Sequence, residues 1–215
     1  MDEPFVVAFV AGVTPGKWAR VWAERMPQHP LSLTASDPDA ALSAIADGSA
    51  HVALVRLPVE DDRFSVIPLY TELPVVVLPK DHELAEPDSL TLADLEGAVV
   101  LDGQGADTVE LVAANVGVAI MPQSVARTHS RRDVVARMLT DGPETRIALV
   151  WLAGDESAEV EEFIGIVRGR TANSSRGSDK PEPEAPPKPP EPPRRAKKPV
   201  RPKGPTPRKK GPKKR

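Results

Sequence analysis

Two short polar segments near the amino end of the sequence have side chains of the kinds that bind small anions. Thr14 stands directly before Pro15 and an amphipathic stretch, in the position of a helix N-cap. Free N–H groups at a helix start attract negative charge, and a cap hydroxyl can add a hydrogen bond. Ser36 and Asp37 precede Pro38 in the same way, although the charge of Asp37 would oppose an anion. The alternative for these residues is helix capping alone.

Arg56 is a second candidate for anion binding because it interrupts the apolar run HVALVRL at residues 51–57. A guanidinium can bind a carboxylate through two parallel hydrogen bonds, so this position could hold an acidic ligand. The alternative is a structural ion pair with Glu60 or Asp61, which follow closely in the chain. Both interpretations stay open on the sequence alone.

The sequence contains no pattern typical of an enzyme or of a metal centre. It has no cysteine, which excludes disulfides, a thiolate nucleophile and a cysteine-type zinc site. We find no Ser–His–Asp arrangement with local support and no phosphate-binding glycine pattern. No cofactor, no metal and no catalytic residue is therefore predicted, and none of the four histidines forms a metal-spaced pair: His29, His51, His82 and His129.

The charge of the chain is divided unevenly, with a boundary after Ala172. The last 43 residues contain 15 Lys and Arg against 4 Asp and Glu, a net charge of +11, together with 13 of the 25 prolines. The first 172 residues contain all eight aromatic residues and 13 basic against 27 acidic side chains, a net charge of −14. The overall net charge of −3 therefore describes neither part.

We expect residues 173–215 to be disordered because they have too few large apolar side chains to offset their ordering entropy. Their positive charge could neutralise phosphates of DNA or RNA, without sequence preference because no aromatic ring is present to stack on bases. The alternatives are a solubilising tail or contact with the acidic body. The residues that would bind nucleic acid are Arg194, Arg195, Lys197, Lys198, Arg201, Lys203, Arg208, Lys209, Lys210, Lys213, Lys214 and Arg215.

The apolar pattern of the first 172 residues alternates between strands and helices. Residues 5–10, 31–34 and 51–57 predict strands, separated by a helix after Thr14 and a second helix capped by Asp37. This order is typical of an α/β fold with parallel strands. Apolar runs predict further strands at 66–70, 74–78, 99–101, 118–121 and 146–152.

Short helices are predicted between these later strands. Thr91 and Asp94 have the spacing of a capping box for a helix over 91–95. Asp107 is expected to cap a helix that Gly117 ends. Two more helices are predicted at 122–129 and around the apolar stripe at 160–167.

Several motifs then occur in a recognisable order: GVTPGKWARVWAERMP, HVALVRLP, PLYTELPVVVLPKDHEL, SLTLADLEG, ELVAANVGVAIMPQSVA and RIALVWL. In this order they resemble the effector-binding domain of the LysR-type transcriptional regulators, which has a two-lobed type 2 periplasmic-binding-protein fold. The resemblance spans residues 5–169 and is most specific in LVAANVGVAIMPQS. The chain looks most like stand-alone actinobacterial proteins of this type that carry basic Lys/Pro tails.

The resemblance implies a first lobe of residues 1–78 and 147–170, a second lobe of residues 79–146, and hinge strands at 74–78 and 146–152. It also implies a small, anionic effector between the lobes, sensed in transcription regulation without catalysis. The positions that match ligand-facing ones in the family are Thr14, Ser36, Arg56, Leu57, Val116, Gly117 and Val118.

Two departures from the family pattern bear on partners and on the cleft. No helix-turn-helix precedes the first strand, so regulation is expected through a homodimer, a separate DNA-binding chain or the basic tail. The segment between Leu101 and Thr108 lacks a helix and a strand of the family, which predicts a shortened second lobe. The amino-terminal apolar run is short and preceded by Asp2 and Glu3, and no membrane span is present, so we expect a cytoplasmic protein.

Overall fold

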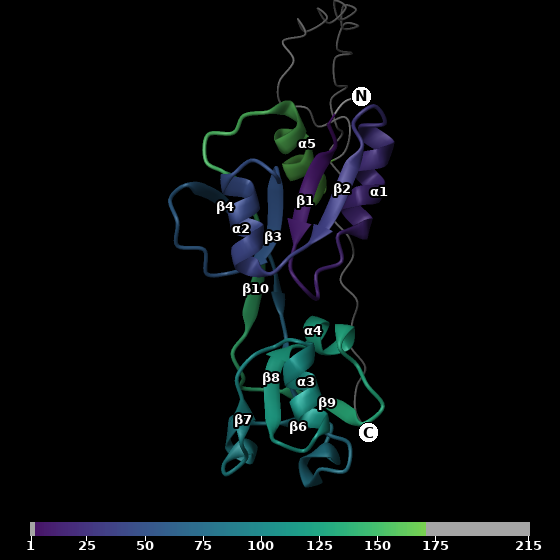
Figure 1. Cartoon of the computed structure of the whole chain (residues 1–215), viewed down its shortest axis with the longest axis vertical. Coiled ribbons are helices and arrows are strands. Elements are labelled where there is room, and N and C mark those ends of the chain that lie inside the picture. The colour runs from purple at the N-terminus through teal and green to yellow at the C-terminus, as the bar shows by residue number, and fades with distance from the viewer. Residues whose placement is uncertain (1–2, 171–215) are drawn as a thin grey trace, which may run out of the picture. The chain divides into compact units, whose positions relative to one another are not determined.

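The structure is a computed structural model that describes residues 3–170 and contains two five-stranded mixed sheets (Figure 1). The predicted disordered tail, with its candidate nucleic-acid-binding residues from Arg194 to Arg215, lies outside the described residues. Its boundary after Ala172 therefore stays a prediction. Within residues 3–170, no helix has the length and apolar character needed to span a membrane.

The first sheet has the strand order β2-β1-β3-β10-β4. Strand β1 pairs in parallel with β2 and β3, which confirms the predicted strand–helix–strand–helix–strand start. Strand β10 is antiparallel to both β3 and β4. The strands of this sheet are β1 (Phe5–Phe9), β2 (Leu31–Ala35), β3 (Val52–Arg56), β4 (Phe64–Glu72) and β10 (Thr145–Leu152).

Three helices surround the first sheet and complete what we call the first lobe (Figure 1): α1 (Gly16–Arg25), α2 (Pro38–Ala46) and α5 (Ala158–Val167). Trp22 of α1 is 1% exposed and stacks on Phe5 of β1, with ring centroids 4.5 Å apart. Phe163 of α5 completes the cluster, 5.5 Å from Phe5 and 5.9 Å from Trp22. This aromatic cluster joins the first and last helices of the lobe.

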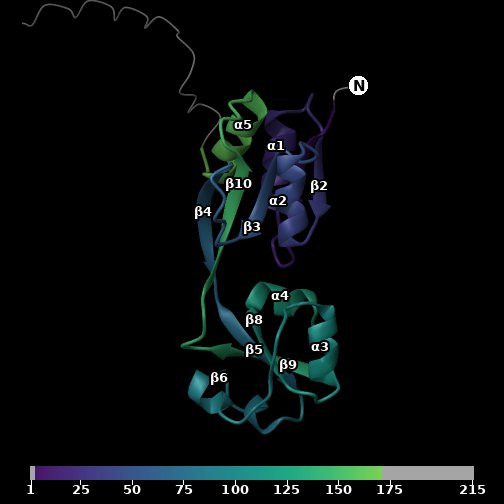
Figure 2. The same ribbon diagram turned by 60° about the vertical axis from the view of Figure 1, so that its left-hand side comes forward.

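The second sheet has the order β6-β9-β5-β8-β7 and, with two helices, forms what we call the second lobe. Figure 2 shows helices α3 and α4 beside strands β8 and β9 of this sheet, and both helices also contact β5. The lobe consists of β5 (Pro74–Pro79), β6 (Ser89–Leu90), β7 (Val100–Leu101), α3 (Ala106–Ala113), β8 (Val118–Pro122), α4 (Gln123–Thr128) and β9 (Val134–Leu139), with 3-10 helices at Glu83–Ala85 and Leu92–Leu95.

Strand β5 is buried on both faces, which explains its unbroken apolar sequence. Val75 and Val77 pack with residues of α3 and α4, whereas Val76 and Leu78 pack on the opposite face with Leu90 and its neighbours.

The predicted lobe boundary at residue 78 is wrong. Among the described residues, strand β5 pairs only with β8 and β9 in the second sheet, so the second lobe begins at Pro74, and Leu73 is the residue between β4 and β5. The physical reason is that β5 is the central strand of the second sheet and is buried at five of its six residues, so it belongs to the core of the second lobe.

Two of the predicted helix caps are confirmed. Asp37 caps α2, because its Oδ1 accepts a hydrogen bond from the Ala40 amide at 2.9 Å. The Thr91–Asp94 capping box is also present, with the Thr91 amide donating to Asp94 Oδ2 at 2.7 Å.

The prediction that Thr14 caps α1 is wrong. The carbonyl of Pro15 accepts from the amides of Trp18 and Ala19, so Pro15 occupies the N-cap position, and no side chain in the described part of the chain caps this helix.

The predicted ends of α3 are also wrong. Gly105 stands at its N-cap, so Asp107 lies within the first turn. The helix stops at Ala113, before the left-handed Asn115 with φ 60°, rather than at Gly117.

Truncation of the aromatic cluster tests this account of the first lobe. We expect Phe163→Ala to lower the free energy of unfolding by about 3–5 kcal/mol, because it leaves a cavity beside Phe5 and Trp22. Urea unfolding followed by circular dichroism measures this change. The matched control is Glu161→Gln on the exposed face of the same helix, for which the change should stay within about 0.5 kcal/mol. Equal changes for the two variants would contradict the account.

Candidate ligand site

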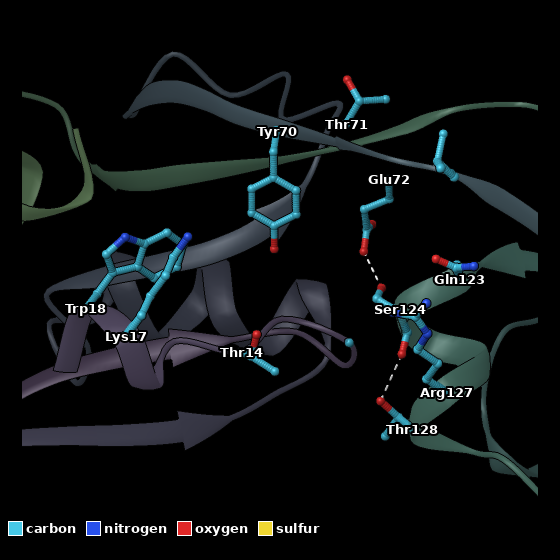
Figure 3. A pocket seen from close by; sticks show the side chains of 12 residues that line it. Thr14, Lys17, Trp18, Tyr70, Thr71, Glu72, Gln123, Ser124, Arg127 and Thr128 are labelled. Carbon is cyan, nitrogen blue, oxygen red and sulfur yellow. Dashed lines mark hydrogen bonds between the residues drawn. The ribbon is translucent and has the colours of Figure 1, made fainter. Parts of the chain in front are cut away.

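A cleft of about 620 Å³ lies where the first and second lobes face each other (Figure 3). Three segments form its walls: the β1–α1 loop with the start of α1, the end of β4, and helix α4. The lining residues are Gly12, Thr14, Lys17, Trp18, Tyr70, Thr71, Glu72, Leu73, Gln123, Ser124, Arg127 and Thr128.

Glu72 is the buried carboxylate of this cleft, with 6% of the residue exposed. Arg56 binds it in two places, through Nε at 2.7 Å and Nη2 at 3.0 Å. The Thr145 hydroxyl donates to Oε2 at 3.0 Å, and the Ser124 hydroxyl donates to Oε1. Three side chains therefore satisfy this carboxylate, as the cost of burying a charge requires.

Arg56 is consequently the internal partner of Glu72. Its Nη2 also donates to the carbonyl of Ala11 in the β1–α1 loop at 2.8 Å. The sequence left open an ion pair of Arg56 with Glu60 or Asp61. An ion pair is present, but its carboxylate is Glu72, and Asp61 binds Arg63 at 2.7 Å. Strands β3 and β4 lie on either side of β10 and are both antiparallel to it, so they run in the same direction. Arg56 and Glu72, which end them, therefore lie at the same end of the sheet.

Two other cations give the cleft an excess of positive charge. Lys17 lies over the ring of Trp18, with its Nζ 4.4 Å from the ring centroid. Arg127 comes from α4 on the opposite wall (Figure 3). Within residues 3–170, neither side chain forms a salt bridge, whereas the charge of Glu72 is balanced by Arg56. The cleft is therefore suited to an anion.

Tyr70 provides an aromatic surface and a polar group in the same cleft. Figure 3 shows its ring between Trp18 and Glu72, with the hydroxyl on the side of Thr14. Partial burial raises the pKa of the Tyr70 phenol, and the negative charge of Glu72 raises it further, while Arg56 acts in the opposite direction. The phenol is therefore neutral at physiological pH and can donate a hydrogen bond.

The structure brings only part of the predicted ligand set to this cleft. Thr14 lines the cleft. Arg56 is not a lining residue, but it binds Glu72, which is one. Val118 is 1% exposed in the second-lobe core, and Gly117 lies against the Val99 carbonyl. Three more predicted residues are not among the lining residues, and their ligand role stays a prediction: Ser36, Leu57 and Val116.

Several lining residues were missed by the sequence analysis. Lys17 follows the predicted helix start directly, and a search of the first turn beyond Thr14 would have found it. Trp18 also lines the cleft, but at 7% exposure it is mainly a core residue, as its place on the apolar helix stripe predicts. Ser124 and Arg127 lie just after the MPQ motif of the second lobe. No local signal marks Glu72, because its partners come from distant parts of the chain.

Comparison with known proteins identifies the family. The model of the LysR substrate binding domain matches residues 15–105 and 103–172. The chain belongs to this family. It is 26% identical over 159 residues to the Hca operon transcriptional activator HcaR of Escherichia coli, which covers 60% of this chain and 54% of HcaR. It is 28% identical over 177 residues to a probable hydrogen peroxide-inducible genes activator of Mycobacterium avium, covering 67% of this chain and 57% of that protein.

Solved structures show the same fold. An H2O2-bound mutant of Corynebacterium glutamicum OxyR aligns with a TM-score of 0.64 and 24% identity, over 77% of this chain and 67% of that one. The BenM effector-binding domain with its effector benzoate aligns with a TM-score of 0.65 and 17% identity, over 77% and 90%. The predicted family and two-lobed fold are confirmed. The two relatives named above are transcriptional activators, and the chain spans only about half of each.

The sequence contains a single tyrosine, so an alkaline absorbance titration reports on Tyr70 alone. We expect its midpoint to lie above the usual tyrosine pKa near 10, because burial and Glu72 both disfavour the phenolate. Glu72→Gln should lower the midpoint. It removes the negative charge that disfavours the phenolate and leaves the positive charge of Arg56, which favours it. Glu60→Gln, an exposed position in the loop before β4, is the control and should leave the midpoint in place. A normal midpoint in the unaltered protein would contradict this description of the site.

Proposed function

We propose that this chain is a non-enzymatic sensor in transcription regulation whose cleft binds a small anionic effector, in the cytoplasm. One observation carries the proposal: within residues 3–170, Lys17 and Arg127 face the cleft from opposite walls without an ion-pair partner, while the only buried carboxylate is already neutralised. An anion placed between the two cations would fill this gap in the charge balance.

The other lining groups favour an acid with an apolar body. Tyr70, with 38% of the residue exposed, offers aromatic surface, and the hydroxyls of Thr14 and Tyr70 can donate hydrogen bonds to an oxyanion. This combination of a few polar groups with aromatic walls is typical of small-molecule sites. The benzoate bound as effector by the similar BenM domain is an acid of this class, which supports the proposal.

A panel of small acids tests the proposal by thermal shift and calorimetry, with benzoate and uncharged benzamide as the first matched pair. An acid at a hundred times its dissociation constant should stabilise the fold by about 2.7 kcal/mol, whereas its neutral amide should not. Lys17→Gln and Arg127→Gln should each weaken binding of the acid.

The control variant is Arg20→Gln, an exposed cation of the same helix α1 that does not line the cleft. It should bind the acid with unchanged affinity. Binding that survives the loss of both Lys17 and Arg127, or no response to any acid in the panel, would overturn the proposal.

The basic composition of residues 173–215 favours a second function, non-specific binding to DNA or RNA. Fifteen positive charges against four negative ones can release counterions from a phosphate backbone. With this binding, a chain of the LysR family could reach nucleic acid directly.

An electrophoretic shift with random duplex DNA at low and high salt tests the second function. The full chain should bind at low salt and lose affinity steeply as salt rises, and deletion of residues 173–215 should abolish binding. Lys17→Gln is the control and should leave DNA binding unchanged. Binding by the deletion variant would contradict the assignment to the tail.

A further inference from the structure

Glu72 connects the two lobes at the back of the cleft. It is the last residue of β4, two positions before the second sheet begins at Pro74. Arg56 ends β3 in the first lobe, and Thr145 begins β10 on the chain segment that returns from the second lobe. Ser124 comes from α4 in the second lobe. One carboxylate thus binds an element of the first lobe, the second crossover segment and the facing wall of the cleft.

The Ser124–Glu72 contact is isolated. Among the described residues, it is the only side-chain hydrogen bond between α4 and the elements of the first lobe. The other hydrogen bonds of Glu72 go to Arg56 of β3 and Thr145 of β10, which both belong to the first sheet. These bonds would survive if α4 moved away. The Gln123 amide also ties the start of α4 to the junction of the lobes, because it donates to the Leu73 carbonyl at 2.9 Å. Ser124–Glu72 is the side-chain contact that adds to this backbone bond and reaches a charged acceptor of the first lobe.

Gly12 allows the β1–α1 loop to approach the same point. A Cβ atom at this position would lie 2.5 Å from Ser124 Oγ and 3.0 Å from the Val125 amide nitrogen. The φ of 86° also favours glycine here. The carbonyl of the preceding Ala11 is held by Arg56, so the loop is fixed to the same ion pair.

We propose that the Ser124–Glu72 hydrogen bond is a latch that holds the second lobe against the β1–α1 loop, and that its breakage opens the cleft. Both partners of this hydrogen bond belong to the chain, so the latch does not depend on the identity of the effector. If the effector is an acid, as proposed above, its carboxylate competes with Glu72 for the Ser124 hydroxyl. Binding and opening are then coupled through one hydroxyl group.

The absence of cysteine from the sequence allows a direct test by distance measurement. Spin labels at Glu24→Cys on α1 and Glu110→Cys on α3 report on the separation of the lobes, since both positions are exposed and outside the cleft. In the full-length chain without ligand, Ser124→Ala should shift the distance distribution to longer values and broaden it. Because the lost bond has a charged acceptor, we expect the open fraction to rise about tenfold or more.

Thr128→Ala is the matched control for Ser124→Ala. It removes a hydroxyl from the same helix and the same cleft wall, but this hydroxyl donates to the Ser124 carbonyl within α4. Its distance distribution should equal that of the parent protein. Identical distributions for Ser124→Ala and Thr128→Ala would overturn the latch.

A second pair of variants tests the latch from the other wall. Gly12→Ala places a methyl group against Ser124 and should open the cleft. Gly48→Ala is its control. Gly48 has a similar φ of 80° but no atom within 4 Å of the added Cβ, so this variant introduces the backbone strain of a positive φ without a steric clash. Opening in Gly12→Ala but not in Gly48→Ala supports the latch, and equal behaviour of the two overturns it. Neither pair requires a ligand, so a failed acid screen leaves this test intact.

Discussion

The burial of one carboxylate constrains the architecture of the cleft. A charge with 6% exposure must be surrounded by donors, and Glu72 recruits Arg56, Thr145 and Ser124. These partners come from β3, from the start of β10 and from α4, so the carboxylate joins the first sheet, the returning crossover segment and the second-lobe wall at one point. The fold places Glu72 at the end of β4, and the hydrogen bonds of its carboxylate bring α4 of the second lobe opposite the end of β4 in the first lobe.

Much of the fold follows from local patterns in the sequence. Unbroken apolar runs predicted the buried strands β1 and β5, a run interrupted only by Arg56 predicted β3, and the Asp37-Pro38 pair marked the start of α2. Strand β9 was missed because Arg137 interrupts it, and that guanidinium binds the Ala85 carbonyl instead of marking a surface loop. The prediction that Thr14 caps α1 was wrong because the helix begins one residue later, where the Pro15 carbonyl accepts the first helical hydrogen bonds.

The site was harder to predict because it is assembled by sheet order. Arg56 has nearby acids in the chain, yet its partner is 16 residues away, across a strand that arrives only at residue 145. No spacing rule links these positions. They meet only because β10, the last strand in the described part of the chain, pairs between β3 and β4 when the first sheet is complete. A resemblance to a family supplies that topology, which explains why the two-lobed fold was predicted while most lining residues were not.

The charge of the cleft also has to be judged locally. The first 172 residues carry a net charge of −14, which by itself disfavours an anionic ligand. The cleft reverses this sign, because Glu72 is neutralised by Arg56 while Lys17 and Arg127 are not paired in the described residues. Exposed acids elsewhere on the body are screened over roughly 8–10 Å at physiological salt, so their effect within the cleft is small. An acidic protein can therefore bind an acid, provided that its own buried carboxylate already has a partner.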